Sequence, residues 1–159
     1  MDAFVQPLYE LADFDAIIRQ LKKPGIVQVS GCLDSQKAHF TNGLLREFPF
    51  RLIVAENDLK AKAFYEDFRL YDPEVLYYPA RDLIFYQADI HGNLLTRQRI
   101  QVLRALLERE EVTIVTSIDS CLDCLVPLAV WKEKVIKIRN DSEIDLDRMK
   151  RHLVELGYE

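Results

Sequence analysis

The feature that most constrains the fold of this chain is a regular alternation between short β-rich runs and amphipathic helical segments. The runs predicted as strands are residues 25–30, 50–55, 75–79 and 112–117. A single helical segment separates each run from the next. Strands joined by single helices need right-handed crossovers and therefore lie parallel in one sheet. The sequence thus predicts an α/β domain with a parallel, doubly wound sheet.

The segments between these runs have the apolar spacing of helices. Helices are expected over residues 11–21, about 35–46, from a cap at Asn57 or Asp58, and over about 93–110. Residues 80–92 look like a loop. The apolar positions expected to face the core are Leu11, Phe14, Ile18, Leu21, Ala61, Phe64, Tyr65, Phe68, Ile100, Leu103 and Leu107.

The pattern changes after Pro127. Residues 134–139 alternate polar and apolar side chains, as a strand with one exposed face does. Asp145 is predicted to cap a further helix, which Gly157 would end; its apolar stripe is Leu146, Met149, Leu153 and Leu156. Because one strand and one helix make a poor domain, we expect residues 1–132 to form the α/β domain and residues 133–159 to be the truncated start of a second, α+β domain.

Composition narrows the function classes. With 49% apolar and 30% charged residues the chain has enough material for a core and a solvated surface. Its net charge of −5 argues against non-specific nucleic-acid binding, which needs clustered Lys and Arg. No apolar run approaches the roughly 18 residues that span a bilayer, and no basic-then-apolar leader is present. We expect a cytoplasmic protein without direct nucleic-acid or membrane binding, whose three cysteines are free thiols.

A degenerate phosphate-loop pattern follows the first predicted strand. Gly31 and Lys37 fit G-x-x-x-x-G-K-[ST], but Gln36 replaces the second glycine and Ala38 replaces the hydroxyl residue. The glycine lets backbone amides curl around phosphates, and the hydroxyl ligates Mg²⁺. Asp34 adds a negative charge where phosphates would lie. The sequence therefore predicts a vestigial loop with no catalytic residue, no bound cofactor and no metal.

Two alternatives to the vestigial loop stay open. Gly31 and Lys37 could flank an ordinary strand-to-helix turn by coincidence, in which case Lys37 is a solvated lysine of the first helical turn. The chain could also be a small phosphate-loop NTPase with an unorthodox nucleotide site.

Cys121 and Cys124 form a C-x-x-C pair, which can be redox-active or supply half of a zinc site. A zinc site needs a second ligand pair, and the remaining candidates are scattered without ligand spacing: Cys32, His39, His91 and His152. The favoured interpretation is that both thiols pack as small apolar groups on an apolar helix.

Other candidate site residues have simpler structural interpretations. Glu56 and Asp119 follow strands, where α/β sheets place functional groups, but each is favoured as a carboxylate at a helix start. A phosphate-binding stripe of Arg97, Arg99, Arg104 and Arg109 is less favoured than a salt-bridged solvent face shared with Glu108, Glu110 and Glu111. Stacking of bases on Tyr77, Tyr78, Phe85 and Tyr86 is less favoured than core and loop packing.

Several stretches resemble the UvrB family of excision-repair proteins. Residues 30–40 are similar to the family's phosphate-loop segment, and residues 52–68 to its next strand and helix. Residues 77–86, 97–100 and 113–117 then follow in the family's order. The segment between Tyr86 and Asn93 is short, where UvrB carries a long β-hairpin that grips DNA. A UvrB-like frame of this kind looks like the N-terminal module of bacterial transcription-repair coupling factors (Mfd), and residues 145–158 resemble the helix that opens their second domain.

The resemblance implies that different parts of a longer protein have different functions. In that family a downstream helicase-like motor uses ATP and Mg²⁺ to push RNA polymerase along DNA. The N-terminal module is not an enzyme; it recruits UvrA and takes part in autoinhibition through contacts with the protein's own motor domains. The residues that contact UvrA would largely follow Glu159.

Overall fold

The computed structural model describes residues 4–80, 89–125, 127–136, 143 and 145–155. The chain divides into two compact units, residues 1–124 and residues 125–159. The expected domain boundary between residues 132 and 133 stays a prediction.

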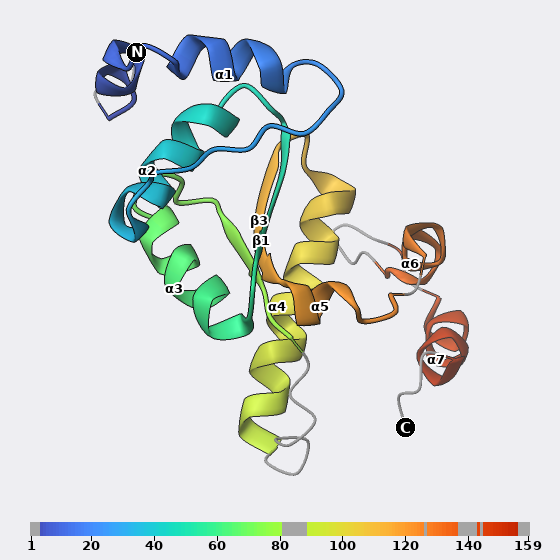
Figure 1. The fold of residues 1–159 in the computed structure, drawn as a ribbon. Helices are drawn as coiled ribbons and strands as arrows, with labels where there is room; N and C mark the ends of the chain where they lie inside the picture. The colour runs from blue at the N-terminus through green and yellow to red at the C-terminus, as the bar shows by residue number, and fades with distance from the viewer. Residues whose placement is uncertain (1–3, 81–88, 126, 137–142, 144, 156–159) are drawn as a thin grey trace. The chain divides into compact units, whose positions relative to one another are not determined.

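The first unit is built on a parallel three-stranded sheet with the order β1-β3-β2 (Figure 1). Its strands are β1 (Phe50–Ala55), β2 (Leu76–Tyr78) and β3 (Val112–Ser117). The central strand pairs Ile114 with Leu52 on one side and with Leu76 on the other. Three of the predicted strands and the predicted α/β class are therefore confirmed, in a small parallel sheet.

The strand predicted at residues 25–30 is wrong. Residues 26–33 have no regular secondary structure, and Ile26 and Val29 are 99% and 41% exposed. The apolar run is present, but no strand in the described part of the chain pairs with it. Strand preference depends on packing against neighbouring strands, so the run alone does not produce a strand.

Helices cover both faces of the sheet (Figure 1). On one face α3 (Asp58–Phe68) contributes Ala61 and Phe68 to a buried cluster whose other members are Ala38, Val75, Tyr77 and Val115. On the other face α4 (Asp89–Glu108) contributes Val102 and Ala105 to a cluster whose other members are Leu76, Tyr78, Val112 and Ile114. Successive residues of β2 belong to opposite clusters, because side chains alternate along a strand.

The start of α3 and the buried face of α4 can be compared with what the sequence predicts. The Asn57 side chain caps α3 by accepting a hydrogen bond from the Lys60 amide at 2.9 Å, as predicted. On α4, Leu103 is buried as expected and Leu107 is half-buried. Ile100 was expected in the core but is 44% exposed, and its neighbour Arg99 is buried instead.

The N-terminal elements form a separate small cluster in the first unit. A 3-10 helix η1 (Gln6–Glu10) precedes α1 (Phe14–Leu21) and α2 (Asp34–Leu45). Their shared apolar contacts are made by Val5, Leu8, Phe14, Ile18, Phe40 and Leu44. Leu11 was expected in a core-facing helix but lies between η1 and α1 and is 51% exposed.

The second unit contains α6 (Leu128–Lys134) and α7 (Leu146–Glu155). The strand predicted at residues 134–139 is wrong at its start, because Lys134 ends α6 and residues 135–136 form no strand; residues 137–139 lie outside the described residues. Asp145 caps α7 as predicted, accepting hydrogen bonds from the amides of Asp147 and Arg148 at 3.0 and 3.1 Å. Leu156 and Gly157 lie outside the described residues. None of the helices described is both long and apolar enough to cross a membrane.

Candidate functional site

The bend that leads into α2 is short. Gly31 adopts φ +90°, a left-handed conformation that glycine tolerates, and α2 begins at Asp34 after an extended Leu33. Gln36, Lys37 and Ala38 therefore lie within the first turns of the helix. A phosphate loop presents several backbone amides outside the helix to the phosphates. Between Gly31 and the start of α2 this bend has few residues whose amides could bind a phosphate.

Backbone groups at the bend bond to one another. The amides of Gln36 and Lys37 both donate to the Leu33 carbonyl, at 2.9 and 3.2 Å. The Leu33 amide in turn donates to the Gln36 side-chain oxygen at 3.2 Å. Gln36, which replaces the second glycine, thus caps the N-terminus of its own helix.

Charged side chains form one ion pair at the bend and a second at the start of α3. Lys37 Nζ lies 2.6 Å from Asp34 Oδ1, and Lys60 pairs with Glu56 at the start of α3. The hydrogen bond and the charge of Lys37 lower the pKa of Asp34, and Lys60 adds a smaller lowering. The hydrogen bond and charge of Glu56 raise the pKa of Lys60. Both Asp34 and Lys37 are exposed, so water screens their attraction.

Ala38 faces the interior. It is 2% exposed and belongs to the same buried cluster as Ala61 and Phe68. A hydroxyl at this position would lie against apolar side chains of α3, where an unpartnered polar group is unfavourable. Position 38 is thus a packing position in this structure.

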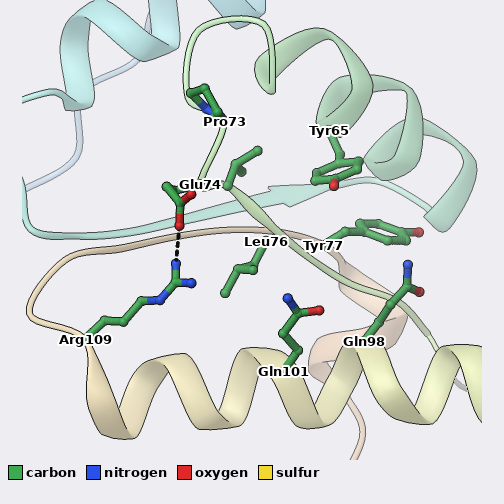
Figure 2. Close-up of a pocket in the computed structure, with 9 residues that line it drawn as sticks. Tyr65, Pro73, Glu74, Leu76, Tyr77, Gln98, Gln101 and Arg109 are labelled. Carbon is green, nitrogen blue, oxygen red and sulfur yellow. Dashed lines mark ion pairs between the residues drawn. The ribbon is translucent and has the colours of Figure 1, made fainter.

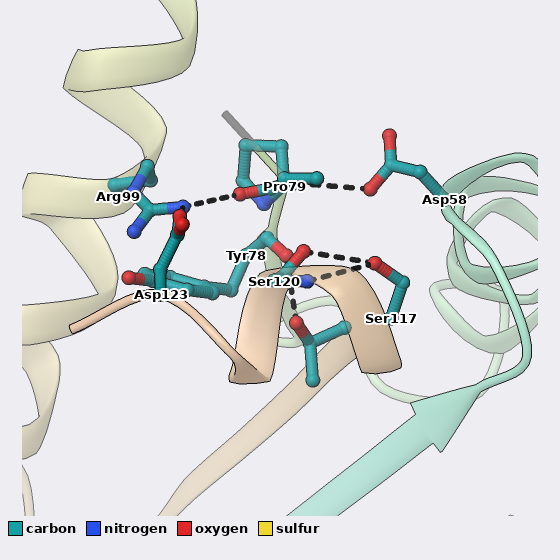
Figure 3. Close-up of polar contacts among 9 residues, drawn as sticks. Asp58, Tyr78, Pro79, Arg99, Ser117, Ser120 and Asp123 are labelled. Carbon is teal, nitrogen blue, oxygen red and sulfur yellow. Dashed lines mark hydrogen bonds and ion pairs between the residues drawn. The ribbon is translucent and has the colours of Figure 1, made fainter. Parts of the chain in front are cut away.

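Arg99 of α4 is the centre of a buried polar cluster at the carboxyl end of β2 (Figure 3). Its Nη1 donates to the Pro79 carbonyl at 2.8 Å and lies 2.9 Å from Asp123 Oδ2. The guanidinium stacks over the Tyr78 ring, 4.2 Å from its centroid. The expectation that Arg99 lies on a solvent face is wrong, because three partners from β2, the residue after it and the turn after α5 hold it inside.

Further hydrogen bonds tie the strand ends to the helices around them (Figure 3). Asp58 of α3 accepts from the Ala80 amide at 3.1 Å, and the Thr116 hydroxyl donates to the Tyr78 carbonyl at 2.9 Å. Ser117 caps the short helix α5 (Ile118–Cys121) by accepting from the Ser120 amide at 3.3 Å, and the two hydroxyls lie 2.9 Å apart. This edge of an α/β sheet is where ligands usually bind. Here Asp58, Thr116 and Ser117 bond to groups of the protein, whereas the buried Arg99 Nη2 has no hydrogen-bond partner among the described residues.

The aromatic candidates lie in the core where they are described. Tyr77 and Tyr78 are both buried, as expected. Burial raises the pKa of Tyr77, and a hydrogen bond with Asp58 adds to that rise; the hydroxyl donates to the Asp58 carbonyl at 3.4 Å. Phe85 and Tyr86 lie outside the described residues.

Cys121 and Cys124 do not pack as predicted. Both are exposed, and only Cys121 is helical, because α5 ends there. Among residues whose positions are described, no group of three His, Cys, Asp or Glu side chains gathers as a metal site would require. Cys32 is half-buried, His39 stacks on Tyr71 with ring centroids 5.3 Å apart, and His152 belongs to α7. The side chain of His91 lies outside what is described.

The remaining charged candidates are at the surface. Asp119 is the first-turn acid of α5, as expected. Arg104 pairs with Glu108 at 2.8 Å and Arg109 with Glu74 at 3.1 Å, which confirms a salt-bridged solvent face for these two arginines. Arg97 is exposed.

A hollow along β2 was not predicted from the sequence (Figure 2). It has a volume of about 300 Å³, and the Glu74–Arg109 ion pair stands at one end. Its lining residues are Tyr65, Pro73, Glu74, Val75, Leu76, Tyr77, Gln98, Gln101 and Arg109. They come from α3, from β2 and the segment before it, and from α4 and the residue after it, so only the tertiary fold brings them together.

Two kinds of known protein are similar to this chain. Transcription-repair-coupling factor of Bacillus subtilis is 29% identical over the whole chain, which spans 14% of that protein. UvrABC system protein B of Treponema denticola is 29% identical over 90% of the chain, and that of Thermosipho africanus is 31% identical over 69% of it. The chain spans 20% and 16% of these two proteins.

No protein-family profile matches the chain. The matched stretches nevertheless cover most of its length and belong to the two kinds of repair protein that its motifs resemble. The chain is thus a homologue of transcription-repair coupling factor and of UvrB, as expected for a UvrB-homology module of a coupling factor.

Proposed function

We propose that this chain is a non-catalytic, N-terminal module of a transcription-repair coupling factor that works by docking to proteins. In this proposal it helps to recruit UvrA and to restrain the parent's ATP-dependent motor during transcription-coupled nucleotide excision repair in the cytoplasm. Nucleotide, Mg²⁺, DNA and RNA polymerase are handled by other parts of the parent. Residues 1–132 are the UvrB-like domain, and its vestigial phosphate loop is formed by Gly31, Gln36, Lys37 and Ala38.

The observation that carries the non-catalytic part is the ion pair between Lys37 and Asp34, 2.6 Å apart within one helical turn. The lysine of a phosphate loop must reach β- and γ-phosphates. Here the Asp34 carboxylate, which like any ordinary aspartate is ionised at neutral pH, forms an exposed ion pair with that lysine. A triphosphate would have to displace Asp34 and then lie beside its negative charge.

Two further features of the bend support the same proposal. The amides of Gln36 and Lys37 are engaged by the Leu33 carbonyl, which removes donors that a phosphate would need. Ala38 is packed in the core, so position 38 offers neither a hydroxyl nor access for a hydrated metal ion. Protein docking is supported by the similarity to coupling factors.

The nucleotide part is tested by titrating the chain with a fluorescent ATP analogue and Mg²⁺. We expect no saturable binding, and the same flat titration for Lys37→Ala and for the matched surface variant Lys62→Ala. Micromolar binding that Lys37→Ala abolishes and Lys62→Ala leaves intact would refute the proposal in favour of an unorthodox phosphate-loop NTPase.

The docking part is tested in the full-length parent. Deletion of residues 1–132 is expected to raise the ATP hydrolysis rate of the motor, because an inhibitory contact is lost. It is also expected to weaken retention of the parent on immobilised UvrA, because the UvrA-contacting residues after Glu159 lose the domain that precedes them. Unchanged hydrolysis together with unchanged UvrA retention would contradict docking by this module.

A further inference from the structure

The hollow along β2 lies beside the sheet rather than on one of its faces. Tyr77 belongs to the buried cluster on the α3 face and Leu76 to the cluster on the α4 face, yet both line the hollow. A space that borders residues of both faces lies at the edge of the strand. On one side β2 pairs with β3, and none of the described strands pairs with its other side. The hollow therefore follows that open side, between α3 and α4 (Figure 2).

The part of β2 that borders the hollow is mainly its backbone. Val75, Leu76 and Tyr77 are at most 9% exposed, because their side chains are packed in the two buried clusters. The open side of an edge strand presents N–H and C=O groups that do not face the neighbouring strand. A ligand in the hollow would thus meet main-chain donors and acceptors in a regular row.

The side chains around the hollow also suit a peptide. Gln98 and Gln101 of α4 both line it, and a carboxamide has a donor and an acceptor, as a peptide group has. Gln101 is exposed and Gln98 is half-buried, so neither is enclosed in the core. On the α3 side, the rings of Tyr65 and Tyr77 lie with their centroids 5.5 Å apart. The hollow thus offers an aromatic wall on one side and two amides on the other.

One end of the hollow holds a positive charge that a ligand can reach. Arg109 Nη1 lies 3.1 Å from Glu74 Oε2, and the two side chains are 41% and 79% exposed. An ion pair this exposed is weak, so a carboxylate from a ligand can take the place of Glu74. The planar guanidinium has five N–H donors and matches a carboxylate with two hydrogen bonds. This end of the hollow therefore favours an acidic group.

We propose that the hollow is a peptide-docking groove, in which an extended segment of a partner protein adds a strand to the open edge of β2. The main chain of that segment pairs with β2 and with the carboxamides of Gln98 and Gln101, and an acidic side chain at one end binds Arg109. Strand addition to a sheet edge is a general mode of peptide recognition. The volume of about 300 Å³ is small for a ligand site, which fits a short segment. This inference rests on the docking part of the proposed function and adds the chemistry of the partner.

The test is fluorescence anisotropy of labelled, end-capped pentapeptides of alternating threonine and valine, titrated with the 159-residue chain. Glutamate, glutamine or lysine replaces the first or the last residue, so that both strand directions are sampled. We expect saturable binding, in which one glutamate peptide binds at least about fivefold more tightly than its glutamine counterpart and the lysine peptides bind most weakly. N-methylation of the peptide amides is expected to abolish binding, because it removes the main-chain donors.

Two variants of the ion pair are expected to act in opposite directions. Arg109→Gln removes the preference for glutamate over glutamine. Glu74→Gln leaves the guanidinium without its competing carboxylate and strengthens binding of the glutamate peptide by about threefold, whereas a damaged fold would weaken it. The matched control is Arg104→Gln, because Arg104 is an exposed arginine of α4 that does not line the hollow. Its peptide affinities should equal those of the native chain.

No saturable binding by any peptide, or equal affinity for glutamate and lysine peptides, would overturn the inference, and so would unchanged binding after N-methylation. A dimer that the glutamate peptide dissociates would show a second copy as the occupant, and binding that the full-length parent lacks would show another part of the parent there. Either result also overturns it. The docking proposal itself is judged by ATP hydrolysis and UvrA retention of the parent, so its failure is distinguishable from failure of the groove.

Discussion

Replacement of Arg99 by methionine tests whether the buried polar cluster holds the first unit together. Methionine keeps most of the length of the stem but removes the hydrogen bond to the Pro79 carbonyl, the ion pair with Asp123 and the stacking on Tyr78. Removing one partner of a buried ion pair costs about 3–5 kcal/mol. The Asp123 side chain is 28% exposed, so water solvates part of the charge left behind, and we expect a loss of about 2–4 kcal/mol.

The assay is urea denaturation followed by far-ultraviolet circular dichroism. With a slope of about 2 kcal/mol per molar urea, the middle of the usual range, this loss lowers the unfolding midpoint by about 1–2 M without changing the slope. Arg99→Lys keeps the charge but not the planar fork that serves two partners at once, so we expect an intermediate loss. The control is Arg104→Met, whose exposed pair with Glu108 contributes at most about 0.5 kcal/mol. A midpoint for Arg99→Met equal to that of Arg104→Met would refute the structural role of Arg99.

Three further outcomes are expected. Gly43→Ala destabilises the chain by about 1–3 kcal/mol in the same urea assay, because a Cβ at Gly43 would overlap the Leu8 side chain and lie 3.0 Å from the Phe14 ring; a midpoint equal to that of the native chain would contradict this. The raised pKa of Tyr77 means that its contribution to stability is complete below the ordinary tyrosine pKa of about 10 and is lost as pH rises above it. Tyr77→Phe should therefore flatten the fall in melting temperature between about pH 9 and 11, and an unchanged fall would argue against this role of Tyr77. Cys121 and Cys124, both exposed, should react with an aromatic disulfide reagent in the folded chain as fast as in urea, and protection of either thiol would show that it is covered.

Elements whose determinants are local were predictable from the sequence. The start of α3 follows from Asn57, whose side chain satisfies a first-turn amide within three residues of itself. The strands β1 and β3 follow from apolar runs that pair with each other over their full length. Residues 25–30 have a similar apolar run, but a strand also needs a neighbour, and no local pattern reveals whether that neighbour exists.

The sequence contains a pattern that predicts the burial of Arg99. Arg99, Val102, Leu103 and Leu106 recur at helical spacing, so the arginine lies on the same stripe as the apolar residues of α4. The sequence does not give the set of partners, because Pro79 comes from the segment just after β2 and Asp123 from the turn after α5. At the bend before α2, too, the sequence gives only part of the answer. Residue identities at Gln36 and Ala38 indicate which groups are missing, whereas the engagement of Lys37 by Asp34 is visible only in three dimensions.

Several residues in the stretches that resemble UvrB hold the fold together and take no part in nucleotide chemistry. Within the stretches that resemble UvrB, Asn57 caps a helix, Pro79 accepts a hydrogen bond at the end of β2, and Arg99 joins that strand end to α5. These contacts maintain the sheet edge whether or not a nucleotide binds there. Similarity at such positions therefore follows from a shared fold, and it is compatible with a bend whose lysine pairs with Asp34 within its own helical turn. The function of this module has to be judged from the bend, the sheet edge and the exposed surfaces, because these three residues report on how the domain is held together.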